Sequence, residues 1–254
     1  MRGSSGMRLG RVSWVKNLER FRSRARQIAR TRSWLYAIVR TLKYGPFFGV
    51  RRRSPLRREL LKHGTREGWR MLNLGSGGCR LRGVVNLDVT PVTGPQVVGD
   101  GYALPFRDET FDVIFCEYVI EHVPDPESFL RAAGRTLKAD GRLYLEAPFL
   151  QPGHDLPGDY TRWTRNGFVR EMERAGLSVV RSGIHLGPAF TLVWIAKDFL
   201  AAVASLGIDR LHRIFRYALA WALSPLMLLD PWLIRLPQAE ALASGYFFLA
   251  VRDD

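Results

Sequence analysis

The 254-residue sequence has only two cysteines and no long uncharged apolar run. Cys79 and Cys116 are too few for a disulfide framework, which indicates reduced thiols in a cytosolic protein. The longest uncharged apolar run, 217–229, is shorter than the ~18–20 residues that cross a bilayer, and 189–206 contains Lys197 and Asp198. We therefore expect no transmembrane helix. No secretory signal is evident either.

Acidic residues are scarce near the N-terminus, where Glu19 and Glu59 are the only acids before residue 61 of a chain with net charge +14. Residues 1–6 resemble an expression-tag remnant. In residues 7–62, dense arginine with apolar residues at helical spacing predicts an arm of basic amphipathic helices. Such helices suit an anionic membrane surface. Nucleic-acid binding, as the weaker alternative, and a plain structural arm also remain open.

The remaining chain is organised around residues 69–88, which read WRMLNLGSGGCRLRGVVNLD. A short apolar strand is followed by a glycine-dense turn at 75–78, a second apolar strand, and Asp88. Glycines let the backbone adopt positive φ and approach a ligand closely. An acid at the end of the second strand can accept two hydrogen bonds from a ribose diol. This order predicts a nucleotide-type cofactor site in a doubly wound sheet.

Three further segments follow in order: VVGDGYALPF at 97–106, ETFDVIFCEYVIEHVPDP at 109–126, and FLRAAGRTLKADGRLYLEAPF at 129–149. Together with 69–88 they resemble class I (Rossmann-like) S-adenosylmethionine (SAM)-dependent methyltransferases. The nearest likeness is to methyltransferase type 11-like members linked to cell-surface polysaccharide loci. The resemblance implies an α/β fold at 63–254, with a doubly wound, mostly parallel seven-stranded sheet. A hydrophobic helical insertion at about 184–243 would precede the last, antiparallel strand.

The resemblance implies SAM as cofactor and S-adenosylhomocysteine as product. Asp88 would bind the ribose and Asp100 the adenine amino group. Since only about ten residues separate the first two strands, which is too few for a full crossover helix, we expect only a turn of helix between them. The expected cofactor-binding residues are Asn73, Gly75, Ser76, Gly77, Asp88, Val89, Asp100, Gly101, Tyr102, Ala103, Glu117, Tyr118 and His122.

Glu117, Glu121 and His122 lie where some metal-using quinone O-methyltransferases carry an E-x-x-E-H pattern. Their spacing in this chain differs from that pattern. We therefore expect no metal, and we expect His122 to make a structural hydrogen bond near the cofactor.

The segment PFLQPGHDLPGDYTRWT, at 148–164, resembles a loop of the polysaccharide-linked members. Because it leaves the fifth strand at its carboxyl end, it should border the methyl acceptor. A hydroxyl acceptor needs a general base, for which His154 is the first candidate, since histidine titrates near neutral pH. Asp159 and Tyr160 are the other candidate catalytic residues, and Arg162 and Trp163 are candidates for acceptor binding. Alternatively, these residues only fix the loop by hydrogen bonds.

The leading functional hypothesis is O-methylation of a lipid-linked or otherwise hydrophobic acceptor by a cytoplasmic protein peripheral to the inner face of the membrane. The basic arm and the apolar insertion motivate it. One alternative is a soluble methyltransferase of a small natural product, with the insertion as a lid. Another is a non-catalytic SAM-fold binding module, and RNA methylation is the weakest because no RNA-binding module is recognisable.

Overall fold

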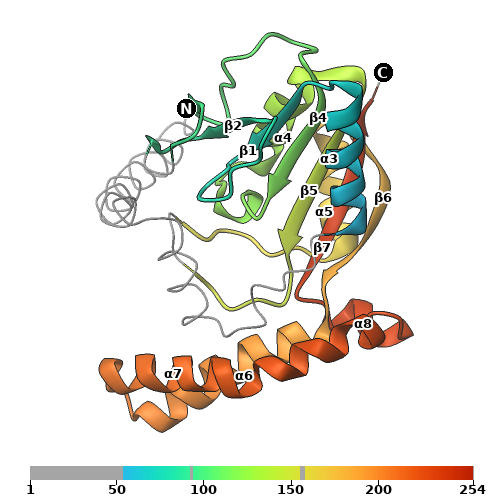
Figure 1. Cartoon of the computed structure of the whole chain (residues 1–254). Helices are drawn as coiled ribbons and strands as arrows, with labels where there is room; N and C mark the ends of the chain where they lie inside the picture. The colour runs from blue at the N-terminus through green and yellow to red at the C-terminus, as the bar shows by residue number, and fades with distance from the viewer. Residues whose placement is uncertain (1–53, 92–93, 155–157, 254) are drawn as a thin grey trace, which may run out of the picture.

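The computed structural model describes residues 54–91, 94–154 and 158–253, so the predicted tag and most of the basic arm lie outside the described residues. Seven strands form one sheet in the order β3-β2-β1-β4-β5-β7-β6 (Figure 1). Strands β1 to β5 pair in parallel, and β7 pairs antiparallel with β5 and β6. This confirms the predicted Rossmann-like methyltransferase fold. The strands are β1 (Met71–Leu74), β2 (Val85–Asp88), β3 (Val97–Val98), β4 (Phe111–Glu117), β5 (Leu137–Pro148), β6 (Leu177–Leu186) and β7 (Gly245–Arg252).

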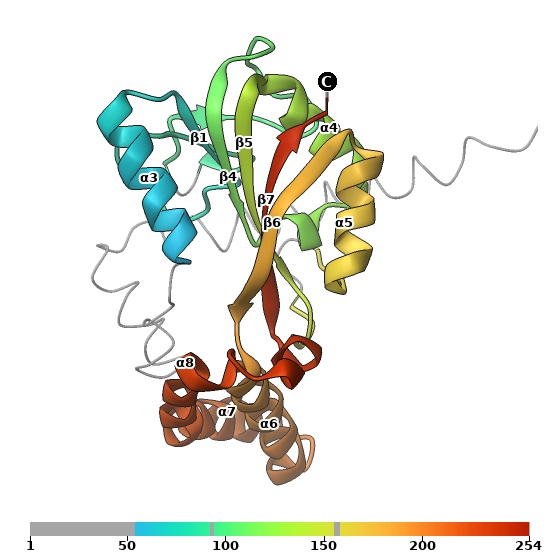
Figure 2. The same cartoon turned by 90° about the vertical axis from the view of Figure 1, so that its right-hand side faces the viewer.

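Both faces of the central strands are covered by helices. Figure 2 shows α3 (Pro55–Glu67) on one side of the sheet, and α4 (Pro126–Thr136) and α5 (Arg165–Arg174) on the other. Side chains of β4 alternate between the two layers: Ile114 packs in the α4 and α5 layer, and Phe115 packs in the α3 layer. Because both faces are buried, the strand is a continuous apolar run.

Helix α3 extends the domain beyond its predicted N-terminal limit. The predicted boundary between residues 62 and 63 falls inside this helix. Leu56 and Leu60 on the N-terminal side of that boundary are buried against the sheet. The last part of the segment assigned to a basic arm is therefore a core helix of the domain.

The sequence predicts both ends of α5, with Thr164 as its N-cap and Gly176 directly after it, and the structure confirms them. Thr164 caps α5, and its hydroxyl accepts a hydrogen bond from the Gly167 N–H at 3.2 Å. The chain after α5 turns through Gly176, whose φ is +77°.

The short connection between β1 and β2 contains turns and no helix in its fully described residues 75–84. The expected turn of helix is therefore absent. Side chains hold the connection instead: Asn73 Nδ2 donates to Asn86 Oδ1 and to the Cys79 carbonyl, each at 2.8 Å. Asn86 Oδ1 also accepts from the Leu81 N–H at 2.8 Å. This buried amide network takes the place of the hydrogen bonds that a crossover helix would supply.

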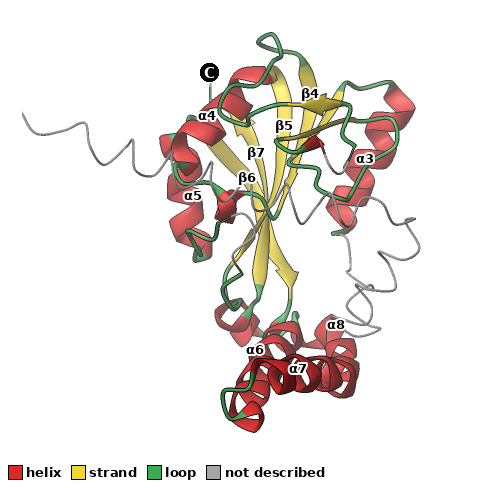
Figure 3. Cartoon of the chain, turned by 90° about the vertical axis from the view of Figure 1, so that its left-hand side faces the viewer, coloured by secondary structure: helices red, strands yellow, loops and turns green. Residues whose placement is uncertain are grey.

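The insertion lies beyond the carboxyl ends of the parallel strands, as Figures 1 and 3 show. It consists of α6 (Pro188–Ser205), α7 (Asp209–Leu223), η4 (Ser224–Leu229), α8 (Asp230–Leu233) and η5 (Pro237–Leu242). The Asp230 carboxylate accepts from the N–H groups of Ala189 and Phe190 at 2.8 and 3.2 Å. These bonds satisfy the first turn of α6 and tie it to α8.

By length and composition alone, α6 meets the standard for a helix that could cross a membrane. Its mean hydropathy is 1.3, and 39% of it is buried within the protein. No such helix was expected from the sequence, because Lys197 and Asp198 interrupt the apolar run. In the structure these two side chains pair with each other at 2.9 Å, so the charges are partly compensated within the helix.

Candidate active site

A cavity of about 200 Å³ opens at the carboxyl ends of β1, β2 and β4. This is the edge where ligands bind in open parallel sheets. Its walls are mostly apolar, with a few polar groups that can orient a ligand. The lining residues are Leu74, Gly75, Gly77, Leu87, Asp88, Val89, Gly99, Asp100, Gly101, Tyr102, Tyr118, Val119, His122, Val123 and Phe129.

Asp88 fixes the glycine turn while facing the cavity. Its Oδ2 accepts from the Gly77 N–H at 2.7 Å, and its Oδ1 accepts from the Thr90 N–H at 2.9 Å. Burial raises the pKa of Asp88, and the backbone N–H groups of Thr90, Gly77 and Val89 partly oppose that rise. Each carboxylate oxygen has a second acceptor site, so the same side chain can also receive a ligand diol.

Gly75 and Gly101 allow two bulky side chains to close on the cavity. A Cβ on Gly75, whose φ is +70°, would lie 2.4 Å from Val119 Cγ2. A Cβ on Gly101 would lie 2.2 Å from the Phe129 ring. Both positions therefore require glycine, because Val119 and Phe129 occupy the space that a side chain would need.

We expect Gly75→Ala to weaken SAM binding at least tenfold. Alanine is strained at this positive φ, and its methyl group would push Val119 into or away from the cavity. Gly83→Ala is the matched control, since Gly83 also has a positive φ but a Cβ added there would meet nothing within 4 Å. Calorimetric titration with SAM measures both variants. Equal affinities would mean that packing at Val119 does not shape the site.

The Asp100 segment forms the next wall of the cavity. Asp100 Oδ1 accepts from the Tyr102 N–H at 3.0 Å. Tyr102 Oη accepts from the Asp125 N–H at 3.0 Å, and its ring meets Phe129 edge-to-face. Burial raises the pKa of Tyr102 to about 12. The phenol is therefore neutral and acts as a fixed wall.

Four residues predicted to bind the cofactor do not line the cavity. Asn73 belongs to the amide network behind it, Ser76 is buried, and the Ala103 N–H turns back to the Asp100 carbonyl. Glu117 forms an ion pair with Arg57 of α3. Resemblance to a motif cannot separate these residues from lining residues, because it does not show in which direction each side chain points.

The lining residues missed by the sequence analysis are Leu74, Leu87, Gly99, Val119, Val123 and Phe129. Most lie directly next to predicted residues, so sequence adjacency was an available signal for them. Phe129 lies in the first turns of α4, and only the glycine at 101 hints at a bulky neighbour.

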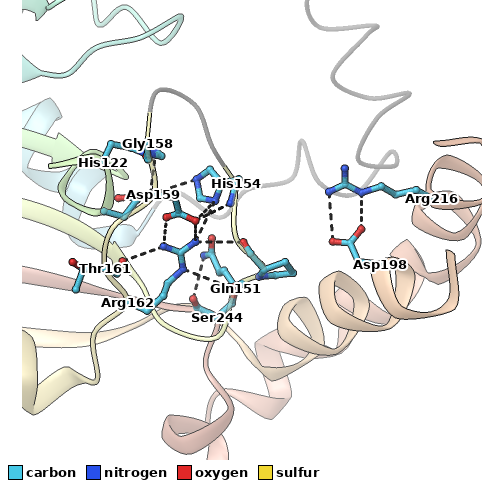
Figure 4. A network of polar contacts seen from close by, with 12 residues as sticks. His122, Gln151, His154, Gly158, Asp159, Thr161, Arg162, Asp198, Arg216 and Ser244 are labelled. Carbon is cyan, nitrogen blue, oxygen red and sulfur yellow. Dashed lines mark hydrogen bonds and ion pairs between the residues drawn. The ribbon is translucent and has the colours of Figure 1, made fainter. Parts of the chain in front are cut away.

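Arg162 organises the loop after β5, as Figure 4 shows. Its Nη2 donates to Asp159 Oδ2 at 2.6 Å and to the Pro152 carbonyl at 3.3 Å. Its Nη1 donates to the Thr161 carbonyl at 3.0 Å and also pairs with Asp159. With its Nε directed at the Gln151 carbonyl, the guanidinium is engaged within the loop. Its geometry supports a structural role in place of the predicted acceptor contact.

Trp163 also departs from its predicted role. Its side chain is buried in the core and meets Phe168 edge-to-face, with ring centroids 4.9 Å apart. The cap at Thr164 starts α5 immediately afterwards, which turns Trp163 inward. Trp163 therefore anchors the end of the loop and does not face an acceptor.

The structure brings together His154 and Asp159, two of the three candidate catalytic residues. The His154 N–H donates to Asp159 Oδ2 at 2.7 Å, and His154 Nδ1 lies 3.8 Å from the same oxygen. Burial alone would raise the pKa of Asp159, but hydrogen bonds from Arg162 and the His154 N–H hold it below its usual value. Tyr160 has an exposed side chain, and its N–H donates to the Glu121 carbonyl at 2.8 Å.

His122 connects this loop with the cavity that it lines. Its Nδ1 is hydrogen-bonded to the Gly158 carbonyl, which agrees with the structural bond predicted for this residue. Its ring meets that of His154 edge-to-face, with centroids 5.0 Å apart. Burial lowers the pKa of His122, so the ring favours the neutral form.

A second cluster of polar side chains is buried behind the site, and the sequence did not predict it. Glu146 Oε1 accepts from the Tyr144 hydroxyl at 2.8 Å, and Glu146 Oε2 lies 3.2 Å from His185 Nε2. The Arg57–Glu117 pair lies in the same α3 layer. These contacts join α3, β4, β5 and β6, so they are long-range pairings without a local sequence signal.

Residues 80–145 match the family described as "Methyltransferase domain". An uncharacterized 37.1 kDa protein in transposon Tn4556 of Streptomyces fradiae is 30% identical, covering 61% of this chain and 45% of that protein. A demethylmenaquinone methyltransferase of Streptomyces griseus is 40% identical over 23% of this chain and 25% of its own. The chain thus spans less than half the length of these curated relatives.

Among solved structures, a putative sarcosine dimethylglycine methyltransferase from Galdieria sulphuraria is similar. It has a TM-score of 0.46 and 17% identity, over 80% of this chain and 87% of that one. The family match, the sheet order and the antiparallel β7 agree with one another. Residues 80–145 thus match a methyltransferase domain, and the sheet around them has the strand order and the antiparallel β7 expected of the class I, SAM-dependent type.

Proposed function

We propose that the protein transfers the methyl group of SAM to an oxygen of a hydrophobic or lipid-linked acceptor at the cytoplasmic face of a membrane. One observation carries the membrane part of this proposal. The insertion exposes large apolar side chains. It lies beyond the carboxyl ends of the parallel strands, as Figure 3 shows, and the cavity opens at the same ends of β1, β2 and β4.

Methyl transfer from SAM is a direct displacement, so the protein mainly supplies alignment and exclusion of water. Asp88 and the glycine turn would hold the ribose. The apolar walls formed by Val119, Val123 and Phe129 would keep water away from the sulfonium. An acceptor would enter from the side of the His154 loop, and its hydroxyl proton must leave before or during attack.

The exposed apolar surface is large for a protein that is surrounded by water alone. On α6, Phe199 is 64% exposed, and Trp232 of α8 is 61% exposed. Surfaces of this kind mark protein or membrane interfaces. The exposed apolar residues of the insertion include Leu192, Ile195, Phe199, Leu200, Val203, Leu206, Ile208, Leu211, Ile214, Tyr217, Trp221, Leu226, Leu228, Leu229, Trp232, Ile234, Leu236 and Leu242.

Charge and aromatic content favour a membrane surface as the partner. Arg210 and Arg213 are exposed on α7, next to the exposed Tyr217 and Trp221. Basic side chains beside tryptophan and tyrosine are typical of helices that lie in a lipid interface. A closed lid on a soluble enzyme would bury these apolar side chains, so their exposure favours the membrane proposal over that alternative.

We expect the double variant Phe199→Ser/Trp232→Ser to lose at least tenfold in affinity for vesicles of phosphatidylcholine and phosphatidylglycerol. Each substitution removes an apolar anchor and leaves the cavity untouched. Val180→Ser on β6 is the control, because Val180 is equally exposed but lies on the sheet. Co-sedimentation measures vesicle binding, and calorimetry should show unchanged SAM affinity.

Two outcomes would count against the membrane surface. The membrane proposal would be refuted if the wild-type protein did not bind anionic vesicles. It would also be refuted if the double variant and the control bound vesicles equally well. If the double variant instead changes a wild-type dimer into a monomer, the apolar surface binds a second copy of the chain.

A further inference from the structure

We propose that Glu121, His122 and His154 bind one divalent transition-metal ion beside the cofactor cavity. Ion binding itself is independent of the proposed function, whereas the chemical role of the ion rests on methyl transfer to a hydroxyl. The three residues come from two segments: η3 (Ile120–His122), which follows β4, and the loop that follows β5. The sequence predicted no metal, because the spacing of Glu117, Glu121 and His122 does not reveal that His154 lies beside them.

The three side chains converge on a small volume. His122 Nε2 lies 3.8 Å from Glu121 Oε1, and His154 Nε2 lies 4.0 Å from the same oxygen. One ligand atom from each residue lies within 4.8 Å of the other two. Bonds of about 2.0–2.2 Å place the donors of a tetrahedral site roughly 3.3 Å apart. Side-chain movements of less than about 1 Å would therefore complete the coordination.

Hydrogen bonding orients the His122 ring toward a metal. Its Nδ1 is bonded to the Gly158 carbonyl, and a carbonyl can only accept, so the proton is on Nδ1. Nε2 then carries a lone pair, and it faces the Glu121 carboxylate, which also offers lone pairs. A cation between these two acceptors would attract both of them. A backbone carbonyl on the second ring nitrogen is a common support for metal-binding histidines.

The loop also fixes the orientation of His154, as Figure 4 shows. Arg162 Nη2 donates to its Nδ1 at 3.3 Å, so in the structure the proton of a neutral ring is on Nε2, which points toward Glu121. When Nε2 binds an ion, the proton moves to Nδ1, where the Asp159 carboxylate, 3.8 Å away, is the acceptor. The His154 N–H is bonded to Asp159, and the Tyr160 N–H is bonded to the Glu121 carbonyl. These backbone bonds fasten the loop to η3, so the three ligands are positioned before any ion arrives.

The donor set indicates the class of ion. Two imidazole nitrogens and one carboxylate suit Zn²⁺, Mn²⁺ or Fe²⁺, whereas Mg²⁺ and Ca²⁺ prefer oxygen ligands only. Three protein ligands leave at least one coordination position open, as in catalytic metal sites. Because His122 also lines the cofactor cavity, that position would lie between the cavity and the acceptor loop.

The open coordination position of such an ion could bind the hydroxyl of the methyl acceptor. An acceptor hydroxyl bound to it would lose its proton to water more readily, since metal binding lowers hydroxyl and water pKa values. The resulting oxygen attacks the methyl carbon of SAM. The new O–C bond forms as the S–C bond breaks, and the electron pair of the S–C bond returns to sulfur. In this arrangement His154 is a ligand and cannot also be the free general base, because both roles use Nε2.

The test is metal binding by the whole protein after removal of bound metal with a chelator. The variants are His154→Ala and Glu121→Gln, and His212→Ala on α7 serves as control. Each protein is dialysed against ZnCl₂ or MnCl₂, and the metal content is measured by mass spectrometry. We expect about one tightly bound ion per wild-type or control chain, and at least tenfold weaker binding by both site variants.

SAM titration on the same samples separates this proposal from the proposed function. Protein that binds SAM but no stoichiometric ion would overturn the metal site while leaving the methyltransferase proposal intact. Wild-type metal content in His154→Ala would also overturn it, and a loss of turnover in that variant would then return His154 to the role of general base. Protein that binds the ion but not SAM would refute the proposed function alone.

Discussion

Replacing Asp88 with alanine should weaken SAM binding by a factor of about 100 or more. The variant loses the acceptors for a ribose diol, and it also leaves the N–H groups of Gly77 and Thr90 without their present partner. A hydrogen bond to a charged group contributes roughly 1.5–3 kcal/mol, and each 1.4 kcal/mol is about tenfold in affinity. Calorimetric titration with SAM and S-adenosylhomocysteine measures the loss.

The control for this variant is Asp140→Ala, which removes an exposed carboxylate from the N-terminal part of β5. Its affinity should equal that of the wild type. If Asp88→Ala also kept wild-type affinity, Asp88 would not hold the ribose. If folded wild-type protein bound no SAM, the non-catalytic alternative would gain support.

The affinity should also depend on pH through Asp88. Burial raises the pKa of its carboxyl above the ordinary value of 3.8. The ionised carboxylate is the better acceptor for a diol, so affinity should be complete well above the raised pKa and fall as the pH decreases through it. The fall should start at a higher pH than an ordinary aspartate would give. Asp88→Asn should show weaker binding without this dependence.

The second large effect concerns stability. Arg57→Ala should reduce the free energy of unfolding by about 3–5 kcal/mol, the usual cost of removing one partner of a buried ion pair. The Arg57 side chain is 1% exposed, pairs with Glu117, and lies over the Phe115 ring at 5.8 Å. Its removal leaves the Glu117 charge inside the α3 layer. Denaturant titration measures the loss.

Arg58→Ala on the exposed face of α3 is the matched control and should change stability by less than about 1 kcal/mol. The double variant Arg57→Ala/Glu117→Gln should recover part of the loss, because the remaining side chain is then neutral. A loss in Arg57→Ala no greater than in Arg58→Ala would mean that the ion pair does not hold α3 to the sheet.

Local patterns account for what the sequence predicted well. The apolar runs of β1, β2 and β4 and the turn at residues 75–78 lie within a few residues of the features they position, so both the sheet and the Asp88 site follow from short segments. The same holds for the Thr164 cap, where the donor is three residues away.

Long-range pairings account for what the sequence could not predict. The sequence predicted Glu117 as a cofactor contact, whereas in the structure Glu117 forms an ion pair with Arg57 of α3. Arg162 and Trp163 resembled acceptor contacts because a loop sequence does not reveal how the loop folds on itself. The proposed metal site likewise needs the loop after β5 to lie against η3, which no spacing within either segment indicates.

The insertion enters and leaves the sheet at one place. Leu186, at the end of β6, is paired in register with Gly245, at the start of β7, and the Ser244 N–H donates to the Leu186 carbonyl at 2.9 Å. A segment whose ends already touch adds little loop-closure entropy, whatever its length. It can be lengthened, trimmed or replaced in evolution without moving the strands that carry Asp88 and the glycine turn. The helices from α6 to η5 are therefore an exchangeable module on a chemical core of fixed geometry.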